Sequence, residues 1–447
     1  MCALKGQISF LYIKYSIMTK TTYKAYRYRW VILAVFMLIS IVIQLQWLTH
    51  AAVERPAEVF YHGQFNPNSF FNIDFLAMVY MLVYIIMSFP ASYIIDTYGI
   101  RKAIGLGAII AAVSGLLKGF YADSFLIVVI AQIGLAIAQP FVLNAVTAIT
   151  VRWFPLRERG LAAGLAILAQ YLGIIFAMLI TPAFIGTNPS LPGYGSGFPH
   201  MLMTYGWITF GAAVVTLLLL KEKPPTPAAA DDLVRQSFYK GLKHILKQRD
   251  MILMILVFLV GLGIFNAISS MTDSISANLG VKDSNGLIGG LMLIGGIFGA
   301  LIIPALSDKY RMRKRFMVIC TVGALPGVLG LSLTGYIVHN PAVVYDIALA
   351  SAFILGFFIM SAGPVGFQYA AEISYPAPET ISQGLLLWIG QISGLLFVAG
   401  MSIHNNKFLN DWMILFSILM PVVVGLTLMT KESSMIITEK DKMKVEG

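Results

Sequence analysis

The sequence contains twelve long apolar stretches, and no other feature restricts its possible folds as strongly. The hydrocarbon core of a bilayer is about 30 Å thick, so a helix needs roughly 20 mostly apolar residues to cross it. Only 12% of the 447 residues are charged, about half the share found in soluble domains. We therefore predict an all-α membrane protein with twelve transmembrane helices. The stretches begin near Trp30, Ile73, Ala103, Phe125, Gly160, Met203, Met251, Asn285, Phe316, Pro341, Thr380 and Leu409.

The positively charged residues gather on one side of the predicted membrane. If the N-terminus is cytoplasmic, the cytoplasmic loops and tails hold all but four of the 31 Lys and Arg residues, the exceptions being Arg55, Lys118, Lys282 and Lys407. This bias follows the positive-inside rule and predicts that both termini are cytoplasmic. The net charge of +10 then attracts an anionic inner leaflet and does not indicate nucleic-acid binding. We expect Lys118, near the end of the third span, to snorkel to water.

A polar segment between the sixth and seventh spans divides the chain into two six-helix halves. It opens with prolines and continues with Leu233, Phe238, Leu242 and Ile245 at helical spacing, which predicts an amphipathic helix on the inner membrane surface. The predicted organisation is a cytoplasmic N-terminal segment, an N-terminal half, a cytoplasmic linker, a C-terminal half and a cytoplasmic tail. Their ranges are 1–29, 30–221, 222–250, 251–430 and 431–447.

Two local patterns add expectations about packing and loops. Gly160 with Gly164, and Gly295 with Gly299, have the small-xxx-small spacing that lets helix backbones approach closely. The first outer loop, from Ala52 to Asn72, is long and mixed in composition. We expect it to be coil.

A short motif recurs in the loop after the second span of each half. The first copy contains Asp96, Tyr98, Gly99, Arg101 and Lys102, and the second contains Asp308, Tyr310, Arg311, Arg313 and Lys314. Two halves related by an axis along the membrane normal are the architecture of major facilitators. The motif resembles that superfamily's loop signature, although Ser92 stands in place of its first glycine. The aspartates can cap or ion-pair neighbouring helix ends and hold one access state shut. The alternative is that the basic residues only obey the positive-inside rule.

Several further stretches resemble one branch of the superfamily, the feline leukaemia virus subgroup C receptor-related (FLVCR) transporters, and the likeness runs from about Arg29 to Thr430. It rests on Gln46-Trp47, Asp74, Met78 to Leu82, Phe89 to Ser92, Ala138-Gln139, Trp153-Phe154, Glu158, Gly366-Phe367, Ala371 to Ile373, Tyr375-Pro376, Glu379 and Gln391. The resemblance implies choline or ethanolamine as substrate, with haem as a further possibility.

The implied pocket contains an aromatic residue on helix one and glutamines on helices four and eleven, which correspond to Trp47, Gln139 and Gln391. The family's second pocket aromatic, on helix seven, aligns with Asn266, and this departure removes half of an aromatic clamp. The resemblance also places Glu372 at the inner gate. Glu379 can cap the start of the eleventh span.

General physical arguments support the same site but leave alternatives. A Trp face attracts a quaternary ammonium, and amide side chains in a span need a cavity or a partner. Trp47 can instead belong to an interfacial aromatic belt, and Gln139 and Gln391 can be interhelical hydrogen-bond partners. Asp273 lies on nearly the same helical face as Asn266 and can attract a cation at the outer entrance, or simply mark the membrane interface.

Other chemistries find little support in the sequence. It has no Walker A loop, no paired histidines that predict a metal or a fixed haem, and no catalytic cluster within a span. We therefore expect neither enzyme activity nor a cofactor. No buried Asp–His or Glu–Arg relay is evident, which favours facilitated transport of a small molecule. Haem, a metal chelate or siderophore, or another metabolite remain alternative cargoes, and a non-transporting receptor is the alternative class. We expect a monomer in a plasma membrane or a bacterial inner membrane.

Overall fold

The computed structural model describes residues 24–226, 228, 238–283, 286–310, 312–374 and 379–433. Within these ranges all regular structure is helical, and twelve helices are long and apolar enough to cross a membrane. This confirms the predicted all-α fold with twelve spans. The spans comprise α2 (Arg29–Trp47), α4 (Phe75–Tyr98), α5 (Ile100–Phe120), α6 (Phe125–Leu143) with α7 (Val146–Trp153), α8 (Leu156–Ile180), α9 (Phe198–Leu219), α11 (Arg249–Ser270), α13 (Leu287–Tyr310), α14 (Arg313–Ile337), α15 (Pro341–Ile373), α16 (Glu379–Asn406) and α17 (Leu409–Met429).

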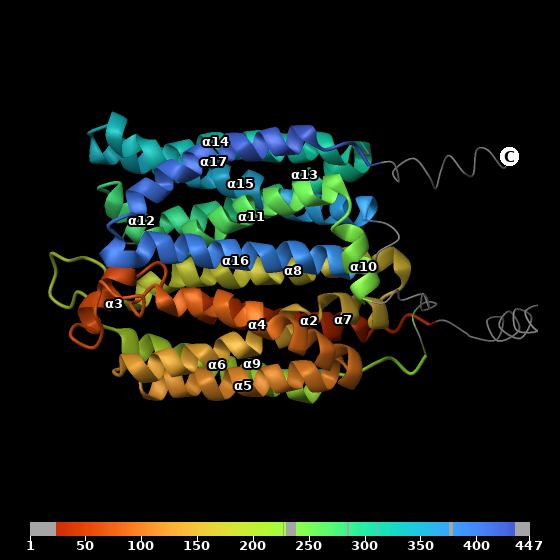
Figure 1. Ribbon diagram of the computed structural model, residues 1–447. Helices are drawn as coiled ribbons and strands as arrows, with labels where there is room; N and C mark the ends of the chain where they lie inside the picture. Colours follow the sequence, from red (N-terminus) through yellow and green to blue (C-terminus); the bar gives the residue numbers. More distant parts are fainter. Residues whose placement is uncertain are drawn as a thin grey trace, which may run out of the picture.

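Four short helices lie at the ends of these spans: α3 (Glu54–Phe60), η1 (Thr181–Phe184), α10 (Phe238–Ile245) and α12 (Thr272–Asn278). The loop that we expected to be coil therefore contains α3. The predicted amphipathic helix is present as α10, while Leu233 lies outside the described residues. We name the two ends of the bundle after α3 and α10, which lie at opposite ends in Figure 1.

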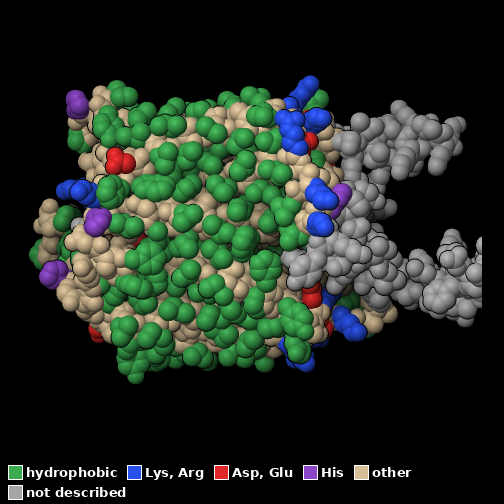
Figure 2. All heavy atoms as spheres, viewed as in Figure 1, with side chains coloured by type: hydrophobic (Ala, Val, Ile, Leu, Met, Phe, Trp, Pro, Cys, Tyr) green, Lys and Arg blue, Asp and Glu red, His purple; other side chains and the backbone are tan. Residues whose placement is uncertain are grey.

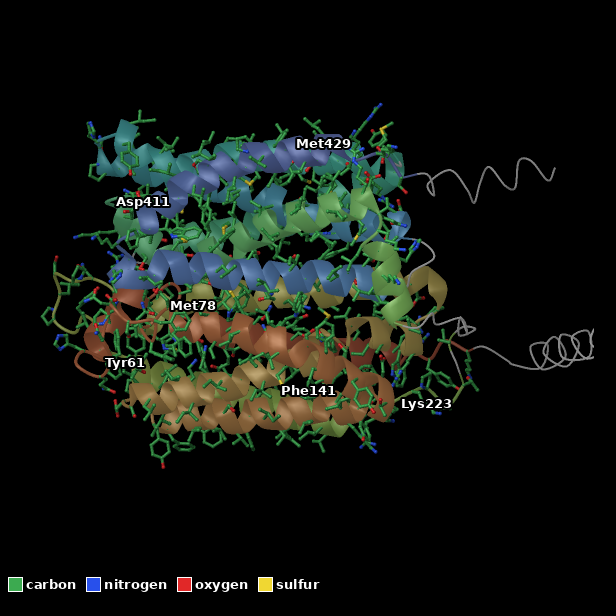
Figure 3. The ribbon with its side chains drawn as sticks, in the orientation of Figure 1. Tyr61, Met78, Phe141, Lys223, Asp411 and Met429 are labelled. Carbon is green, nitrogen blue, oxygen red and sulfur yellow. The ribbon has the colours of Figure 1, made fainter. Side chains whose placement is uncertain are left out.

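The surface separates apolar and charged residues along the bundle. Figure 2 shows an apolar belt around the middle and most of the visible Lys and Arg side chains at the α10 end. Lys223 lies at this end and Tyr61 at the α3 end (Figure 3). The belt suits a protein that crosses a bilayer, because lipid contacts it without hydrogen bonding. By the positive-inside rule the α10 end is the predicted cytoplasmic side.

The two sets of six spans meet through equivalent helices. In the first set α2 packs against α8 and α9, and in the second set α13 and α14 pack against α15. Between the sets, α4 packs against α16 and α8 packs against α13. These are the second with the eleventh span and the fifth with the eighth. Such reciprocal pairing is what a two-fold axis along the membrane normal produces.

Close helix approach depends on glycine in one of the two predicted pairs. A Cβ atom at Gly299 would lie 1.9 Å from the carbonyl oxygen of Phe357, and one at Gly295 would lie 2.4 Å from that of Phe353. Both oxygens belong to α15, so α13 and α15 touch backbone to backbone. A Cβ at Gly164 would meet nothing within 4 Å. Close packing is therefore confirmed for Gly295 and Gly299 and is wrong for Gly164.

We expect Gly299→Ala to lower the free energy of unfolding by about 1–3 kcal/mol, because the methyl group forces two backbones apart. Gly164→Ala is the matched control, and it should be neutral or stabilise by up to about 1 kcal/mol through helix propensity. Thermal unfolding of the two purified variants measures the difference. Equal unfolding temperatures would contradict the close contact of α13 with α15.

Candidate functional site

Trp47 is the last residue of α2 and is buried against α4. Its indole Nε1 donates a hydrogen bond to the Ala77 carbonyl oxygen at 3.2 Å, and its ring lies 6.3 Å, centroid to centroid, from the Tyr80 ring. Only 5% of Trp47 is exposed. Trp47 therefore faces protein and not the lipid that an interfacial belt would require.

Gln139 lies beside the same face of α2. Its Nε2 donates to the Gln44 Oε1 at 3.1 Å, and both side chains are buried. Gln44 is three residues before Trp47, so the two side chains point to the same side of the helix. Our sequence reasoning missed Gln44. A signal was available, because an amide one turn from a candidate aromatic in a span is itself unusual.

The opposing side of the interface carries the two remaining amides. Asn266 is buried in α11, and its Nδ2 donates to the Gly390 carbonyl oxygen of α16 at 3.2 Å. Gln391 is the next residue and is half-buried. The bond between Asn266 and Gly390 fixes the depth at which Gln391 lies along the bundle.

The two sides come together near one small cavity. Trp47 of α2 and Ser270 of α11 both line it, and both helices run from the α10 end to the α3 end. Gln44 and Asn266 are three and four residues earlier, and so each lies about one turn nearer the α10 end. Gln139 is bonded to Gln44 at that level, and Gln391 follows Gly390, whose carbonyl oxygen accepts from Asn266. The structure thus places Trp47, Gln139, Asn266 and Gln391 around one part of the interface between the halves.

Asp273 has a partner that the sequence did not reveal. It lies in α12 and forms an ion pair with Arg55 of α3, with 2.6 Å between Arg55 Nη2 and Asp273 Oδ1. The Arg55 backbone N–H also donates to the same carboxylate at 2.7 Å. The Asp273 side chain is 4% exposed and that of Arg55 is 38% exposed. Since Arg55 precedes Asp273 by 218 residues, neighbourhood in the sequence gave no hint of the pair.

Further polar contacts join the two halves at the α3 end. Asn72 Nδ2 donates to Ser402 Oγ at 2.6 Å, and Asn406 Nδ2 donates to Glu54 Oε1 at 3.0 Å. Asn406 has a left-handed backbone with φ of 59°, which asparagine tolerates better than most residues. Together with the ion pair between Arg55 and Asp273, these contacts close the α3 end.

At the α10 end, the ion pairs of Arg29 and Arg313 each remain inside one half. Arg29 pairs with Glu158 at 2.9 Å, and both belong to the N-terminal spans. Arg313 pairs with Glu372 at 3.0 Å within the C-terminal spans. Midway along the bundle, Trp388 Nε1 donates to a carbonyl oxygen of α4 across the interface. Of these ion pairs, the one between Arg55 and Asp273 joins the two halves, and it lies at the α3 end.

The first copy of the repeated motif is organised by a carboxylate that we did not predict. Glu222 accepts hydrogen bonds from the backbone N–H groups of Ile100 and Arg101, at 3.3 and 2.8 Å, and ion-pairs with Arg152. Gly99 has φ of 94°, a backbone conformation that glycine adopts without strain and that other residues rarely adopt. Asp96 is exposed nearby, so Glu222 and not Asp96 caps α5.

The second copy repeats this capping. Glu432 accepts a hydrogen bond from the Lys314 backbone N–H at 2.9 Å at the start of α14. Both capping glutamates follow a lysine just after the last span of their half, as Lys221-Glu222 and Lys431-Glu432. The side chains of Asp308 and Glu379 lie outside the described residues, although α16 does begin at Glu379. Gating by these residues stays a prediction.

Buried ionisable residues surround the α3 end, contrary to our expectation from the sequence. His50, Glu54 and Asp74 are each at least 95% buried. Lys118 is fully buried and its Nζ donates to Gln46 Oε1 at 3.3 Å, so the expected snorkelling to water is wrong. The argument for facilitated transport from a missing buried relay therefore loses its basis. Among the described residues, no group of three His, Cys, Asp or Glu could hold a metal ion.

Comparison with known proteins agrees with this architecture. The chain is 28% identical to choline/ethanolamine transporter flvcr2a of Danio rerio over 391 residues, which make up 84% of this chain and 80% of that protein. It is 26% identical to choline/ethanolamine transporter FLVCR1 of Felis catus over 381 residues, or 83% of this chain and 66% of that protein. These similarities confirm the resemblance to the FLVCR branch.

Solved structures show the same fold at low sequence identity. A D-xylose-proton symporter matches with a TM-score of 0.67 and 15% identity, over 91% of this chain and 99% of that one. A bacterial homologue of the human lysosomal transporter Spinster, in an inward-facing conformation, matches with a TM-score of 0.66 and 14% identity, over 90% and 97%. The profile of the Major Facilitator Superfamily matches residues 28–398. The chain is thus a multi-pass membrane protein that belongs to the Major Facilitator Superfamily of transporters.

Proposed function

We propose that this protein moves a small organic solute, of the choline or ethanolamine class, by alternating access between its two halves. The observation that carries the proposal is the arrangement at the interface. Trp47 and the bonded amides of Gln44 and Gln139 approach from one half, and Asn266 and Gln391 approach from the other. A solute held there contacts both halves, which is the geometry that alternating access requires.

An aromatic pair favours a substrate with a cationic head group. The Trp47 and Tyr80 rings are neighbours at 6.3 Å, so Tyr80 of α4 supplies the second aromatic surface that Asn266 does not. A cation over such a face gains about 0.5–2 kcal/mol. Amide oxygens of Gln139 and Gln391 can accept a hydrogen bond from an alcohol or ammonium. The relatives named as choline/ethanolamine transporters support the same substrate class.

The contacts at the two ends support a gating scheme. The ion pair between Arg55 and Asp273 holds the α3 end shut, and its loss lets that end open. At the α10 end the capping of α5 by Glu222 and the pair of Arg313 with Glu372 keep each half rigid during this motion. We further propose that the halves 30–221 and 251–430 move as units on the linker 222–250, as a monomer with both termini cytoplasmic.

Ligand-dependent thermal stabilisation of the purified protein tests the substrate class. We expect choline or ethanolamine to stabilise the protein, by about 2.7 kcal/mol at one hundred times the dissociation constant. Trp47→Ala should abolish the effect. Trp207→Ala is the matched control, because Trp207 is 53% exposed on α9 and should leave it unchanged. Haem, metal chelates and amino acids complete the panel, and stabilisation by one of these instead would overturn the choline assignment.

A further inference from the structure

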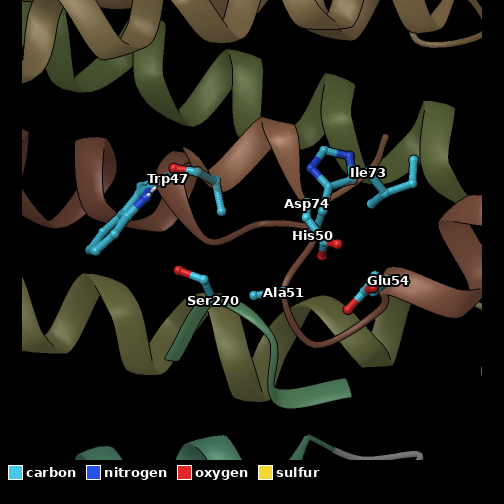
Figure 4. A pocket seen from close by; sticks show the side chains of 8 residues that line it. Trp47, His50, Ala51, Glu54, Ile73, Asp74 and Ser270 are labelled. Atoms are coloured by element: carbon cyan, nitrogen blue, oxygen red, sulfur yellow. Dashed lines mark hydrogen bonds between the residues drawn. The ribbon is translucent and has the colours of Figure 1, made fainter. Parts of the chain in front are cut away.

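A small cavity beneath α3 is lined by buried polar side chains, several of whose atoms have no hydrogen-bond partner among the described residues. Trp47, His50, Glu54, Asp74 and Ser270 line it together with Ala51, Ile73 and Ala77. In Figure 4, His50, from the stretch that leads into α3, and Glu54, the first residue of α3, lie near Asp74, which immediately precedes α4. Its volume, about 10 Å³ for the centre of a water molecule, has room for roughly one water.

Five buried polar atoms of these residues have no hydrogen-bond partner within the part of the chain that the structure describes. They are both ring nitrogens of His50, Oε2 of Glu54, Oδ1 of Asp74 and the Ser270 hydroxyl. A buried polar atom without a partner has lost its hydration and gained no hydrogen bond in return, which destabilises the folded chain. Five such atoms around one cavity indicate that the cavity takes up a small species that can both donate and accept hydrogen bonds.

The surroundings of the cavity disfavour ionisation of Glu54 and Asp74 at the same time. Burial raises the pKa of Glu54 well above its usual value, and the charges of Asp74, Asp273 and Glu58 raise it further. Burial also raises the pKa of Asp74. Of the cations nearby, Arg55 is engaged with Asp273. Burial, and then the charge of Lys118, hold the pKa of His50 well below its usual value, so the imidazole does not neutralise the pair.

Both carboxyl groups belong to the contact between the two halves. Glu54 accepts a hydrogen bond from Asn406 of α16. Asp74 is linked to the same helix through Asn72, whose Nδ2 lies 3.3 Å from Asp74 Oδ2 and 2.6 Å from Ser402 Oγ. When the halves separate at this end, water reaches both carboxyls. Their surroundings therefore differ strongly between the closed and open states.

We propose that this cavity is a proton-binding site, in which Glu54 and Asp74 share one proton that is taken up from water when the α3 end closes. The neutral His50 ring and the Ser270 hydroxyl complete its hydrogen bonds, directly or through one water. Two neighbouring buried carboxyls commonly hold a single proton, because both cannot ionise side by side.

The direction in which pH affects closure follows from the different surroundings of the two carboxyls in the closed and open states. The closed state raises the carboxyl pKa values relative to the open, hydrated state. The proton's contribution to closure is therefore fully present below the open-state pKa, and it is lost as pH rises through the closed-state pKa. Alkaline conditions thus favour opening of the α3 end. The protein would thus bind a proton each time the α3 end closes and release it on opening, whichever solute it carries.

Infrared difference spectroscopy of the reconstituted protein tests protonation directly, without any substrate. The experiment uses a Glu58→Gln background, because burial raises the pKa of Glu58 to about 7 and its band would overlap. We expect a protonated-carboxyl C=O band at neutral pH that disappears at alkaline pH. Glu54→Gln and Asp74→Asn should each remove or shift it. Asp411→Asn, an exposed carboxyl at the same end of the bundle, should leave it unchanged.

A distance measurement links the proton to closure. Spin labels at Asp123→Cys and His339→Cys, two exposed positions at the α3 end on different halves, report the separation of the halves in a chain without its native cysteines. We expect the separation to grow from mildly acidic to alkaline pH, and Glu54→Gln with Asp74→Asn to remove this response. A missing carboxyl band, a separation that ignores pH, or a response to sodium at constant pH would each overturn the proposal. None of these outcomes depends on choline.

Discussion

Arg55→Ala should make a cysteine at position 270 at least about 30-fold more reactive toward a membrane-impermeant thiol reagent applied from the α3 side. Ser270 lines the closed cavity and is buried, so its reaction requires the α3 end to open. Losing one partner of a buried ion pair across an interface costs about 2–5 kcal/mol, and because Arg55 is 38% exposed while Asp273 is 4% exposed, we use the lower figure. The lower figure corresponds to about 30-fold in the opening equilibrium. Water reaches the abandoned Asp273 carboxylate only in the open state, which adds to the shift.

The controls for this experiment come from the same end of the bundle. Lys407→Ala removes an exposed cation and should not change the reactivity, whereas exchanging the charges with Arg55→Asp and Asp273→Arg should restore much of the closure. The native cysteines Cys2 and Cys320 are replaced by alanine throughout. If Arg55→Ala behaves like Lys407→Ala, the ion pair does not hold this end shut.

Arg313→Ala should lower the free energy of unfolding by about 3–5 kcal/mol, the cost of leaving a buried charge without its partner. The side chains of Arg313 and Glu372 are 10% and 12% exposed. The Arg313 guanidinium also donates to Ser307 Oγ at 3.2 Å. Denaturant unfolding in detergent measures the loss. Arg315→Ala is the matched control, because this neighbouring arginine is exposed, and it should change little.

The same variant separates a structural role from a gating role. Because Arg313 and Glu372 both belong to the C-terminal half, Arg313→Ala should leave the reactivity of a cysteine at position 270 near the wild-type value. A rise as large as that for Arg55→Ala would show that the pair also acts on closure of the distant end. If Arg313→Ala and Arg315→Ala have the same free energy of unfolding, the pair of Arg313 with Glu372 does not stabilise the fold.

The fold could be predicted from the sequence because the bilayer sets one length and one composition for every span. Packing was harder to predict. Gly299 and Gly164 have the same spacing pattern, yet only Gly299 meets another backbone. Which face of a helix meets a neighbour depends on the whole bundle, and a pattern within one span does not contain that information.

The candidate site was predicted in part, and the missing residues share one property. Gln44, Arg55 and Glu222 acquire their roles only through partners that are far away in the sequence: Gln139, Asp273 and Arg101. The carboxyls of Glu54 and Asp74 lie outside the apolar windows of the spans, where charged residues are common, and although Asp74 was part of the resemblance, neither position predicted burial. Because Glu54 and Asp74 lie between two spans, the sequence did not show that the folded chain buries them next to each other.

Transport of a choline-like solute is tested by uptake of labelled choline and ethanolamine into proteoliposomes that contain the purified protein. We expect saturable uptake of at least one of the two compounds, reduced in Trp47→Ala and retained in Trp207→Ala. Absence of uptake for both compounds, in a preparation that transports another solute from the panel, would contradict the assignment of this interface to a choline-like substrate.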